Sequence, residues 1–425
     1  MAGWAGHMRA DGIPAAALRD AWRALWLSRA LVWTAGVGAV LALGRSGQRL
    51  AFDPAGLTDP FGRVGDVLMG PAARWDSVWF LLIADQGYAN DERVAFFPLY
   101  PMLLNVAGGG DGTRLVAGAL LSTAFLLVAL VLVHRLTSME LGVAAARPAV
   151  LALAFFPMAF FFSAVYSESL YLALSAGSFY AARRGRWALA GATGALAAAT
   201  RSAGVVLFLP LALLYLYGPR ADRPPDHAPG RVLRPRYRVR RDAAWLALVP
   251  AGLAAFAVYL ALDGVGATAP FHAQDVWFRH FAGPFGGVRD AAVAAFDGAR
   301  QLIQGTRFPV RFTAAGGDPF NVAGHNLVLF AFLLAAVPAV VGVLRRLPAA
   351  YGAYTLAALA LPLSYPVAPQ PLMSLPRFLA VLFPLHMWAG WRLARRRRVG
   401  LAALAASGAA LAFFAGAFAT WHWVA

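Results

Sequence analysis

The sequence contains 425 residues, of which 60% are hydrophobic and only 13% are charged. Soluble domains of this size carry about a quarter charged residues, so this composition excludes an ordinary soluble protein and indicates a membrane protein. All 37 basic residues are arginine and cysteine is absent, which excludes disulfides and thiolate chemistry, and we interpret the net charge of +17 as arginine-rich cytoplasmic loops rather than as nucleic-acid binding.

Apolar runs of near-spanning length recur along the whole chain. The first, residues 25–43, has no small-residue cleavage site after it, and we interpret it as an anchor rather than a signal peptide. With the N-terminus in the cytoplasm, every strong arginine cluster falls on one side, as the positive-inside rule requires. About eleven transmembrane helices are therefore predicted, at residues 25–43, 114–136, 148–164, 169–182, 187–199, 205–217, 243–262, 322–344, 351–366, 378–393 and 399–423.

This topology predicts an all-α polytopic membrane protein built as a single transmembrane domain over residues 1–425. Residues 44–111 form the first extracytoplasmic loop, residues 218–242 an arginine-rich cytoplasmic loop, and residues 263–321 a second large extracytoplasmic loop. No internal repeat is found, so an inverted-repeat transporter receives no support. The use of arginine to the exclusion of lysine is typical of a GC-rich genome, and we expect a multi-pass protein of a bacterial plasma membrane.

The first extracytoplasmic loop contains the stretch "ARWDSVWFLLIADQGYANDERVAFFPLYP", in which Asp76 stands between two tryptophans. Asp76 and Gly87 fit the N-cap and C-cap of a short helix, and the apolar residues between them suit a helix lying in the membrane interface. Asp76 is also a candidate general base, and the two roles are compatible because a helix N-terminus stabilises a charged carboxylate. The aromatics of "AFFPLYP" favour an interfacial belt over a sugar-stacking platform.

Three further ionic residues lie at outer turns between apolar helices. Glu168 occurs in "FFFSAVYSESLYLAL", Arg201 in "AAATRSAG" and Arg377 in "SLPRFLAVLFP". A charge in the hydrocarbon costs a few kcal/mol, so such residues usually face a bundle interior or a cavity. The two arginines could bind a phosphate bidentately, or they could pair with Glu168 or snorkel to the surface. We therefore predict a polar site on the extracytoplasmic face that these residues share with Asp76.

Motifs for metal or nucleotide chemistry are missing from the sequence. It has no H-E-x-x-H, G-x-S-x-G, P-loop or D-x-D motif, and His272, Asp275 and His280 match no metal-ligand spacing. An enzyme that uses a nucleotide sugar commonly holds a metal on the diphosphate with D-x-D acids. A lipid monophosphate-sugar donor requires only cations such as arginine, so neither a metal nor another cofactor is expected.

Five stretches, taken together and in order, resemble the PIG-V type of GPI mannosyltransferase over about residues 74–386. They are "RWDSVWFLLIADQGY", "AFFPLYPMLL", "FFPMAFFFSAVYSESLYLAL", "ATRSAG" and "LPRFLAVLFPLH". The resemblance implies a GT-C type fold, with short interfacial helices and the catalytic acid in the first extracytoplasmic loop. It also implies a polyprenyl-phosphate-linked sugar donor and an inverting reaction. Asp76 matches the catalytic acid of that loop, Glu168 the acid of the S-A-x-Y-[ST]-E block, Arg201 the arginine of the T-R-S block, and Arg377 the basic residue of the final P-R-[FY] block.

Two departures from the family pattern bear on the acceptor. A bacterium is not expected to make GPI anchors, and the eukaryotic T-R-S-N-G sequence reads "TRSAG" here, with Ala203 in place of the asparagine. The acceptor is therefore expected only to be a lipid or glycan.

The resulting prediction is a membrane mannosyltransferase that acts on the extracytoplasmic face, without a metal, on a polyprenyl-phosphate-sugar donor. Asp76 is the predicted base, and Arg201 and Arg377 the predicted phosphate ligands. Supporting roles at the acceptor or sugar site are expected for Arg74, Trp75, Tyr100, Tyr166 and Glu168. The alternatives are a lipid or glycan transporter or flippase, a non-catalytic scaffold, and a GT-C transferase for another sugar.

Overall fold

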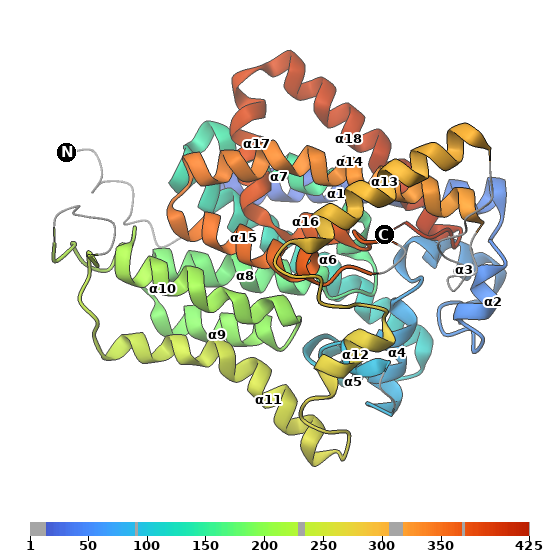
Figure 1. The fold of residues 1–425 in the computed structure, drawn as a ribbon, viewed down its shortest axis with the longest axis horizontal. Coiled ribbons are helices and arrows are strands. Elements are labelled where there is room, and N and C mark those ends of the chain that lie inside the picture. The colour runs from blue at the N-terminus through green and yellow to red at the C-terminus, as the bar shows by residue number, and fades with distance from the viewer. Residues whose placement is uncertain (1–13, 90–91, 228–233, 306–317, 368–369, 425) are drawn as a thin grey trace.

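The computed structural model describes residues 14–89, 92–227, 234–305, 318–367 and 370–424. Within these ranges the chain is helical, apart from turns and one isolated antiparallel bridge between Arg279 and Val367 (Figure 1). The prediction of an all-α polytopic membrane protein is confirmed. Parts of the three predicted loops, at residues 90–91, 228–233 and 306–317, lie outside the described residues, and the loop boundaries stay predictions.

The elements follow one another along the chain as α-helices and short 3₁₀ helices (η). The first half contains α1 (Ala15–Leu43), α2 (Gln48–Phe52), α3 (Gly62–Met69), η1 (Gly70–Ala72), α4 (Ser77–Gln86), η2 (Arg93–Ala95), α5 (Leu99–Ala107), α6 (Asp111–Leu141), α7 (Val143–Ala154), η3 (Ala159–Ser163), α8 (Glu168–Arg183) and α9 (Trp187–Ala198). The second half contains η4 (Ser202–Leu207), α10 (Phe208–Tyr217), η5 (Arg241–Ala247), α11 (Leu248–Leu262), α12 (Ala269–Val276), α13 (Gly286–Gln304), α14 (Pro319–Arg346), α15 (Ala349–Ser364), α16 (Leu375–Val381), α17 (Phe383–Arg395) and α18 (Arg397–Ala419).

Each of the eleven predicted spans coincides with helical structure, but the helices differ in length. Five are long and apolar enough to cross a membrane, namely α1, α6, the η5–α11 pair, α14 and α18. The helices α7, α9, η4–α10 and α15 are apolar but shorter. Length and composition therefore support five spans, or six if a bent pair in the first loop counts as one, and the total of eleven stays a prediction.

Small residues allow the helices to pack closely. At the contact between α7 and α17, a Cβ added to Gly390 would lie 2.3 Å from the backbone nitrogen of Ala149, so only glycine permits this approach. Helix α1 packs against α18, and α6 packs against both α7 and α8. The first and last long helices are thus neighbours, and they bring the C-terminal end of α18 to the start of the first loop.

The first loop contains a bent helix pair with Asp76 at the break. The segments Gly62–Ala72 and Ser77–Gln86 meet at an angle of 106° and together are apolar enough for a broken span or a re-entrant loop. Gly87 ends α4 as predicted, with φ 70° and its N–H bonded to the carbonyl of Ile83. Most of the apolar side chains of α4, such as Phe80 and Leu81, are buried in the core, and the interfacial position of this helix stays a prediction.

The second loop lies against the first. Helix α12 packs on η2, while α13 packs along α14 and α15 (Figure 1). Trp277, just after α12, meets Trp79 of α4 with ring centroids 6.0 Å apart. The two loops that were predicted to share one side of the membrane are therefore in contact.

Candidate active site

A tight turn presents Asp76 at the break between η1 and α4. Trp75 has φ 54°, a left-handed conformation that a bulky residue adopts only where its surroundings hold it there. The hydroxyl of Tyr166 accepts the N–H of Asp76 and donates to the carbonyl of Arg74, both at 3.1 Å. Tyr166 therefore bonds to the backbone on both sides of Trp75 and holds the turn in place.

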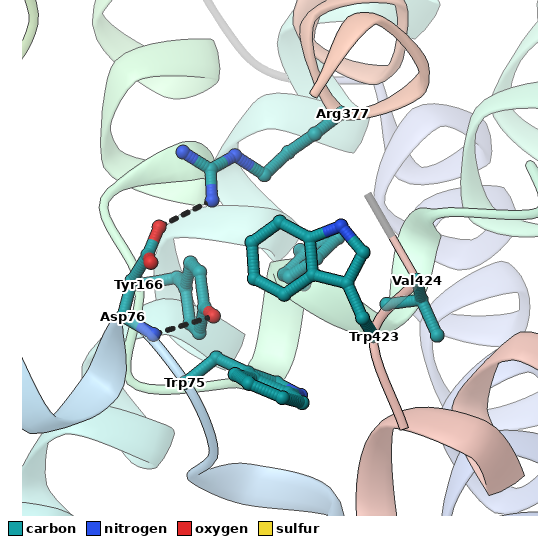
Figure 2. A pocket seen from close by; sticks show the side chains of 7 residues that line it. Trp75, Asp76, Tyr166, Arg377, Trp423 and Val424 are labelled. Atoms are coloured by element: carbon teal, nitrogen blue, oxygen red, sulfur yellow. Dashed lines mark hydrogen bonds and ion pairs between the residues drawn. The ribbon is translucent and has the colours of Figure 1, made fainter. Parts of the chain in front are cut away.

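The carboxylate of Asp76 faces away from its own helix. It occupies the N-cap position of α4, yet it makes no capping hydrogen bond to the helix. Its Oδ2 instead accepts a hydrogen bond from Nη1 of Arg377 at 2.5 Å (Figure 2). The predicted capping role is thus wrong for the side chain, because a buried guanidinium outcompetes the helix amides for the carboxylate.

Glu168 joins the two arginines that were singled out in the sequence. Its Oε1 lies 2.5 Å from Nη1 of Arg201 and 2.9 Å from Nε of Arg377, and its side chain is only 1% exposed. Glu168 is the first residue of α8, where the helix dipole also favours a negative charge. The pairing of both arginines with Glu168, one of the alternatives left open by the sequence, is what the structure contains.

The four side chains form a continuous chain of alternating charge, in the order Asp76, Arg377, Glu168 and Arg201. We call this set the ionic chain. Its members come from the first loop, α16, the start of α8 and the residue before η4, and each is at most 15% exposed in its side chain. Two carboxylates and two guanidinium groups compensate one another, which makes the burial of charge tolerable in a membrane protein.

A small, partly open pocket lies beside Asp76 (Figure 2). Its lining consists of Trp75, Asp76, Phe161, Tyr166, Arg377, Trp423 and Val424. The pocket therefore combines one carboxylate and one guanidinium with aromatic walls. The sequence had not singled out Phe161, Trp423 or Val424, because nothing distinguishes them from the many other apolar residues of the chain.

Aromatic packing fixes the wall of this pocket. The ring centroid of Trp75 lies 5.1 Å from that of Trp423, 5.4 Å from that of Trp421 and 5.2 Å from that of Phe52. Within the described residues, the buried indole N–H of Trp75 has no hydrogen-bond partner. A buried donor without a partner costs free energy, which the packing of the surrounding rings has to offset.

Arg74 and Tyr100, predicted to support the site, lie outside the pocket. Arg74 is fully buried, with Nη1 3.5 Å from Asp59 and Nε donating to the carbonyl of Ala419 at 3.2 Å, so it ties the first loop to the end of α18. The hydroxyl of Tyr100 bonds to Ser122, which in turn donates to the carbonyl of Tyr166. Both residues contribute to the framework behind the site.

Nothing in the described part of the chain brings together three His, Cys, Asp or Glu side chains that could hold a metal ion. His272, Asp275 and His280 lie in and after α12 without forming such a group. The cationic groups available to a ligand at this site are therefore those of arginine.

Tyr166→Phe should lower the free energy of unfolding by about 1–3 kcal/mol, because it leaves a buried N–H and a buried carbonyl without their partner. Thermal unfolding of the purified protein in detergent measures this effect. Tyr180→Phe is the matched control, since the Tyr180 hydroxyl accepts only a 3.4 Å bond from Arg135. Equal stability of the two variants would contradict the role of Tyr166 in holding the turn.

Comparison with known proteins gives matches over the first half of the chain. Residues 51–212 match the family described as mannosyltransferase (PIG-V). This segment contains Asp76, Glu168 and Arg201, whereas Arg377 and Trp423 lie beyond it. No solved structure matches the chain, so the GT-C type of fold stays a prediction.

Among curated proteins, the chain is similar to GPI alpha-1,6-mannosyltransferase 2 of Rattus norvegicus, with 35% identity over 172 residues, which cover 37% of this chain and 34% of the relative. The enzyme of the same name from Mus musculus is 34% identical over 166 residues, or 36% of this chain and 33% of the relative. GPI mannosyltransferase 2 of Yarrowia lipolytica is 31% identical over 136 residues, or 32% of this chain and 38% of the relative. The matches thus span about a third of the length of these relatives.

Proposed function

We propose, from the match of residues 51–212 to the PIG-V mannosyltransferase family, that this membrane protein transfers mannose from a polyprenyl-phosphate-linked donor to a hydroxyl of a lipid or glycan acceptor. One observation of the structure supports the proposal independently of the family match. The carboxylate of Asp76 lies in a pocket with aromatic walls and is paired there with the guanidinium of Arg377. A base and a cation in one pocket are the two groups that transfer from a phosphate-linked sugar requires.

The reaction is a single displacement that inverts the anomeric carbon. The carboxylate of Asp76 takes the proton of the acceptor hydroxyl while the hydroxyl oxygen forms a bond to that carbon. The bond from the anomeric carbon to the phosphate oxygen breaks, and its electron pair leaves with the polyprenyl phosphate. Arg377 and Arg201 stabilise the negative charge that develops on this leaving group.

Arg377 connects the base to the proposed phosphate site. Its Nη1 pairs with Oδ2 of Asp76, and its Nε lies 2.9 Å from Oε1 of Glu168. The same guanidinium that orients the carboxylate of Asp76 is therefore proposed to bind the phosphate of the donor.

The aromatic walls suit a sugar ring. Trp75 and Trp423 offer aromatic surface for the C–H groups of a hexose.

The arrangement of arginine in the sequence supports one side of the membrane for the site. Arginine-rich turns and the 218–242 segment indicate the cytoplasmic side, and the ionic chain lies at the opposite ends of the helices in that topology. We therefore assign the site to the extracytoplasmic face of a bacterial plasma membrane. A polyprenyl-phosphate sugar is a suitable donor there, since it is carried by the membrane itself.

The proposal is tested by giving purified protein in lipid nanodiscs radiolabelled polyprenyl-phosphate-mannose together with an extract of glycolipid acceptors. We expect the label to appear in a lipid or glycan product. Parallel reactions with polyprenyl-phosphate-glucose and polyprenyl-phosphate-arabinose identify the sugar. Movement of the labelled lipid across the bilayer of a proteoliposome, without formation of a product, would contradict the proposal and indicate a transporter.

Trp423→Ala should lower kcat/KM for sugar transfer by about 3- to 10-fold, as the loss of one aromatic contact of about 0.5–1.5 kcal/mol requires. Initial rates at varied donor concentration measure this change. Trp22→Ala is the control, because Trp22 is 50% exposed on α1 and does not line the pocket. If both variants retain wild-type kcat/KM, Trp423 forms no part of the sugar site.

A further inference from the structure

Arg279 of the second loop is held against the segment that precedes α16. Its backbone forms an isolated antiparallel β-bridge with that of Val367. Its side-chain Nη1 donates to the carbonyl of Tyr365 at 3.2 Å. The N–H of His280 bonds to the carbonyl of Pro366 at 3.3 Å, and the N–H of Ala282 to that of Ser364 at 3.0 Å. These contacts fix the backbone around Arg279 against residues 364–367, which follow α15.

The second loop also packs against the first loop, through Trp277. The ring centroid of Trp277 lies 6.0 Å from that of Trp79 and 6.0 Å from that of Phe96. Trp79 belongs to α4, three residues after Asp76. Arg279 therefore lies between the segment 364–367 and the first loop, whose Asp76 belongs to the ionic chain.

The charge of the ionic chain is balanced, whereas that of Arg279 is not. Asp76 and Glu168 compensate Arg201 and Arg377, so these four residues add no net charge to attract an anion. In the part of the chain that the structure describes, the guanidinium of Arg279 donates to a neutral carbonyl, and no carboxylate lies within ion-pair distance of it. Arg279 thus supplies an uncompensated positive charge at this site.

The positive charges of neighbouring arginines affect the protonation of Arg279. Burial and the positive charges of Arg377 and Arg201 lower the pKa of Arg279 to about 10. The guanidinium remains protonated at neutral pH, but it is destabilised by its cationic neighbours. A bound anion relieves this repulsion, and a third arginine without an acid therefore favours an anion at this position.

We propose that Arg279 completes a phosphate subsite with Arg377 and Arg201, and that it is the residue through which the site attracts the phosphodiester of the sugar donor. Three arginines and two carboxylates leave a net charge of about +1, which matches the single negative charge of a sugar–phosphate–polyprenyl diester. The identity of this phosphate as part of a sugar donor rests on the proposed function. The subsite itself requires only a lipid phosphate.

The direct test measures binding of undecaprenyl phosphate to the purified protein in nanodiscs, without turnover. Arg279→Gln should weaken this binding by about 10- to 100-fold, as expected for the loss of a charge-assisted contact with a phosphate. Arg279→Lys, which retains the charge, should recover most of the affinity. Arg289→Gln is the matched control, because Arg289 is an exposed arginine of α13 in the same loop.

Binding of undecaprenol, which lacks the phosphate, separates recognition of charge from support of the loop. It should be unchanged in Arg279→Gln. The proposal is overturned if the variant binds undecaprenyl phosphate like the wild type, or if it loses the alcohol and the phosphate equally. If phosphate binding depends on Arg279 but no sugar is transferred, the subsite stands and the proposed mannosyltransferase reaction fails.

Discussion

Asp76→Asn is expected to reduce sugar transfer by about 10²- to 10⁴-fold, the contribution of a positioned general base. Asparagine has nearly the same shape as aspartate, and its carbonyl oxygen can still accept the hydrogen bond that Arg377 donates at 2.5 Å. It cannot take up the proton of an acceptor hydroxyl. The effect should therefore appear in kcat, with little change in the KM for the donor.

The change in activity has to be separated from a change in folding. Asp85→Asn is the matched control, because Asp85 also lies on α4 but is 46% exposed and pairs with Arg114 at the surface. Thermal unfolding in detergent should show both variants folded. Near-normal turnover of a folded Asp76→Asn protein would contradict the assignment of Asp76 as the base.

Glu168→Gln is expected to lower the free energy of unfolding by about 3–5 kcal/mol, because it removes the acid shared by two buried cations. Arg201 and Arg377 both contact Oε1 of Glu168, and a neutral amide cannot compensate their charges. Asp76 still pairs with Arg377, whereas Arg201 has no second acid within ion-pair distance among the described residues. The ionic chain is therefore interrupted at its centre.

Denaturant or thermal unfolding in detergent measures this loss, with Asp85→Asn again as the surface control. The double variant Glu168→Gln with Arg201→Gln removes one charge of each sign. It should be more stable than the single Glu168→Gln variant, since fewer uncompensated charges remain buried. If Glu168→Gln is as stable as the wild type, the ionic chain does not contribute to the stability of the fold.

The sequence predicted the residues of the ionic chain because a charge within an apolar stretch is conspicuous. Glu168 is one of only three glutamates, and Arg201 and Arg377 stand at turns that are flanked by apolar residues. Positive-inside topology assigned them to one side, and the family resemblance selected Asp76. Their mutual contacts could not be derived in this way, since the same pattern fits both free cations and ion pairs.

Other residues near the site cannot be recognised in this way from the sequence. Trp423 is one of 13 tryptophans, and Arg279 is one of the 37 arginines of the chain, so only the structure shows that Trp423 lines the pocket and that Arg279 contacts Tyr365 and Val367. Arg74 is close to Asp76 in sequence but does not line the pocket. The left-handed conformation of Trp75 turns the chain between them, and the side chain of Arg74 enters the core on the far side.

The ends of the helices could not be predicted from the sequence either. Apolar composition predicted where helices lie, but breaks such as the one at Leu382 between α16 and α17 depend on tertiary contacts that composition does not contain. The same holds for α7, which ends at Ala154 and is followed by a 3₁₀ turn within the predicted span 148–164. Hydropathy averages over such breaks, so it overestimates the length of individual spans.

The packing of the first loop against the end of the last helix has a consequence for the order in which the protein is made. Arg74 bonds to the carbonyl of Ala419, and Trp423 lines the same pocket as Asp76, so residues from both ends of the chain are needed to build it. During synthesis the first loop reaches its side of the membrane long before α18 is inserted. The pocket can therefore close only after insertion of the last helix, and a partly inserted chain cannot hold a substrate in it.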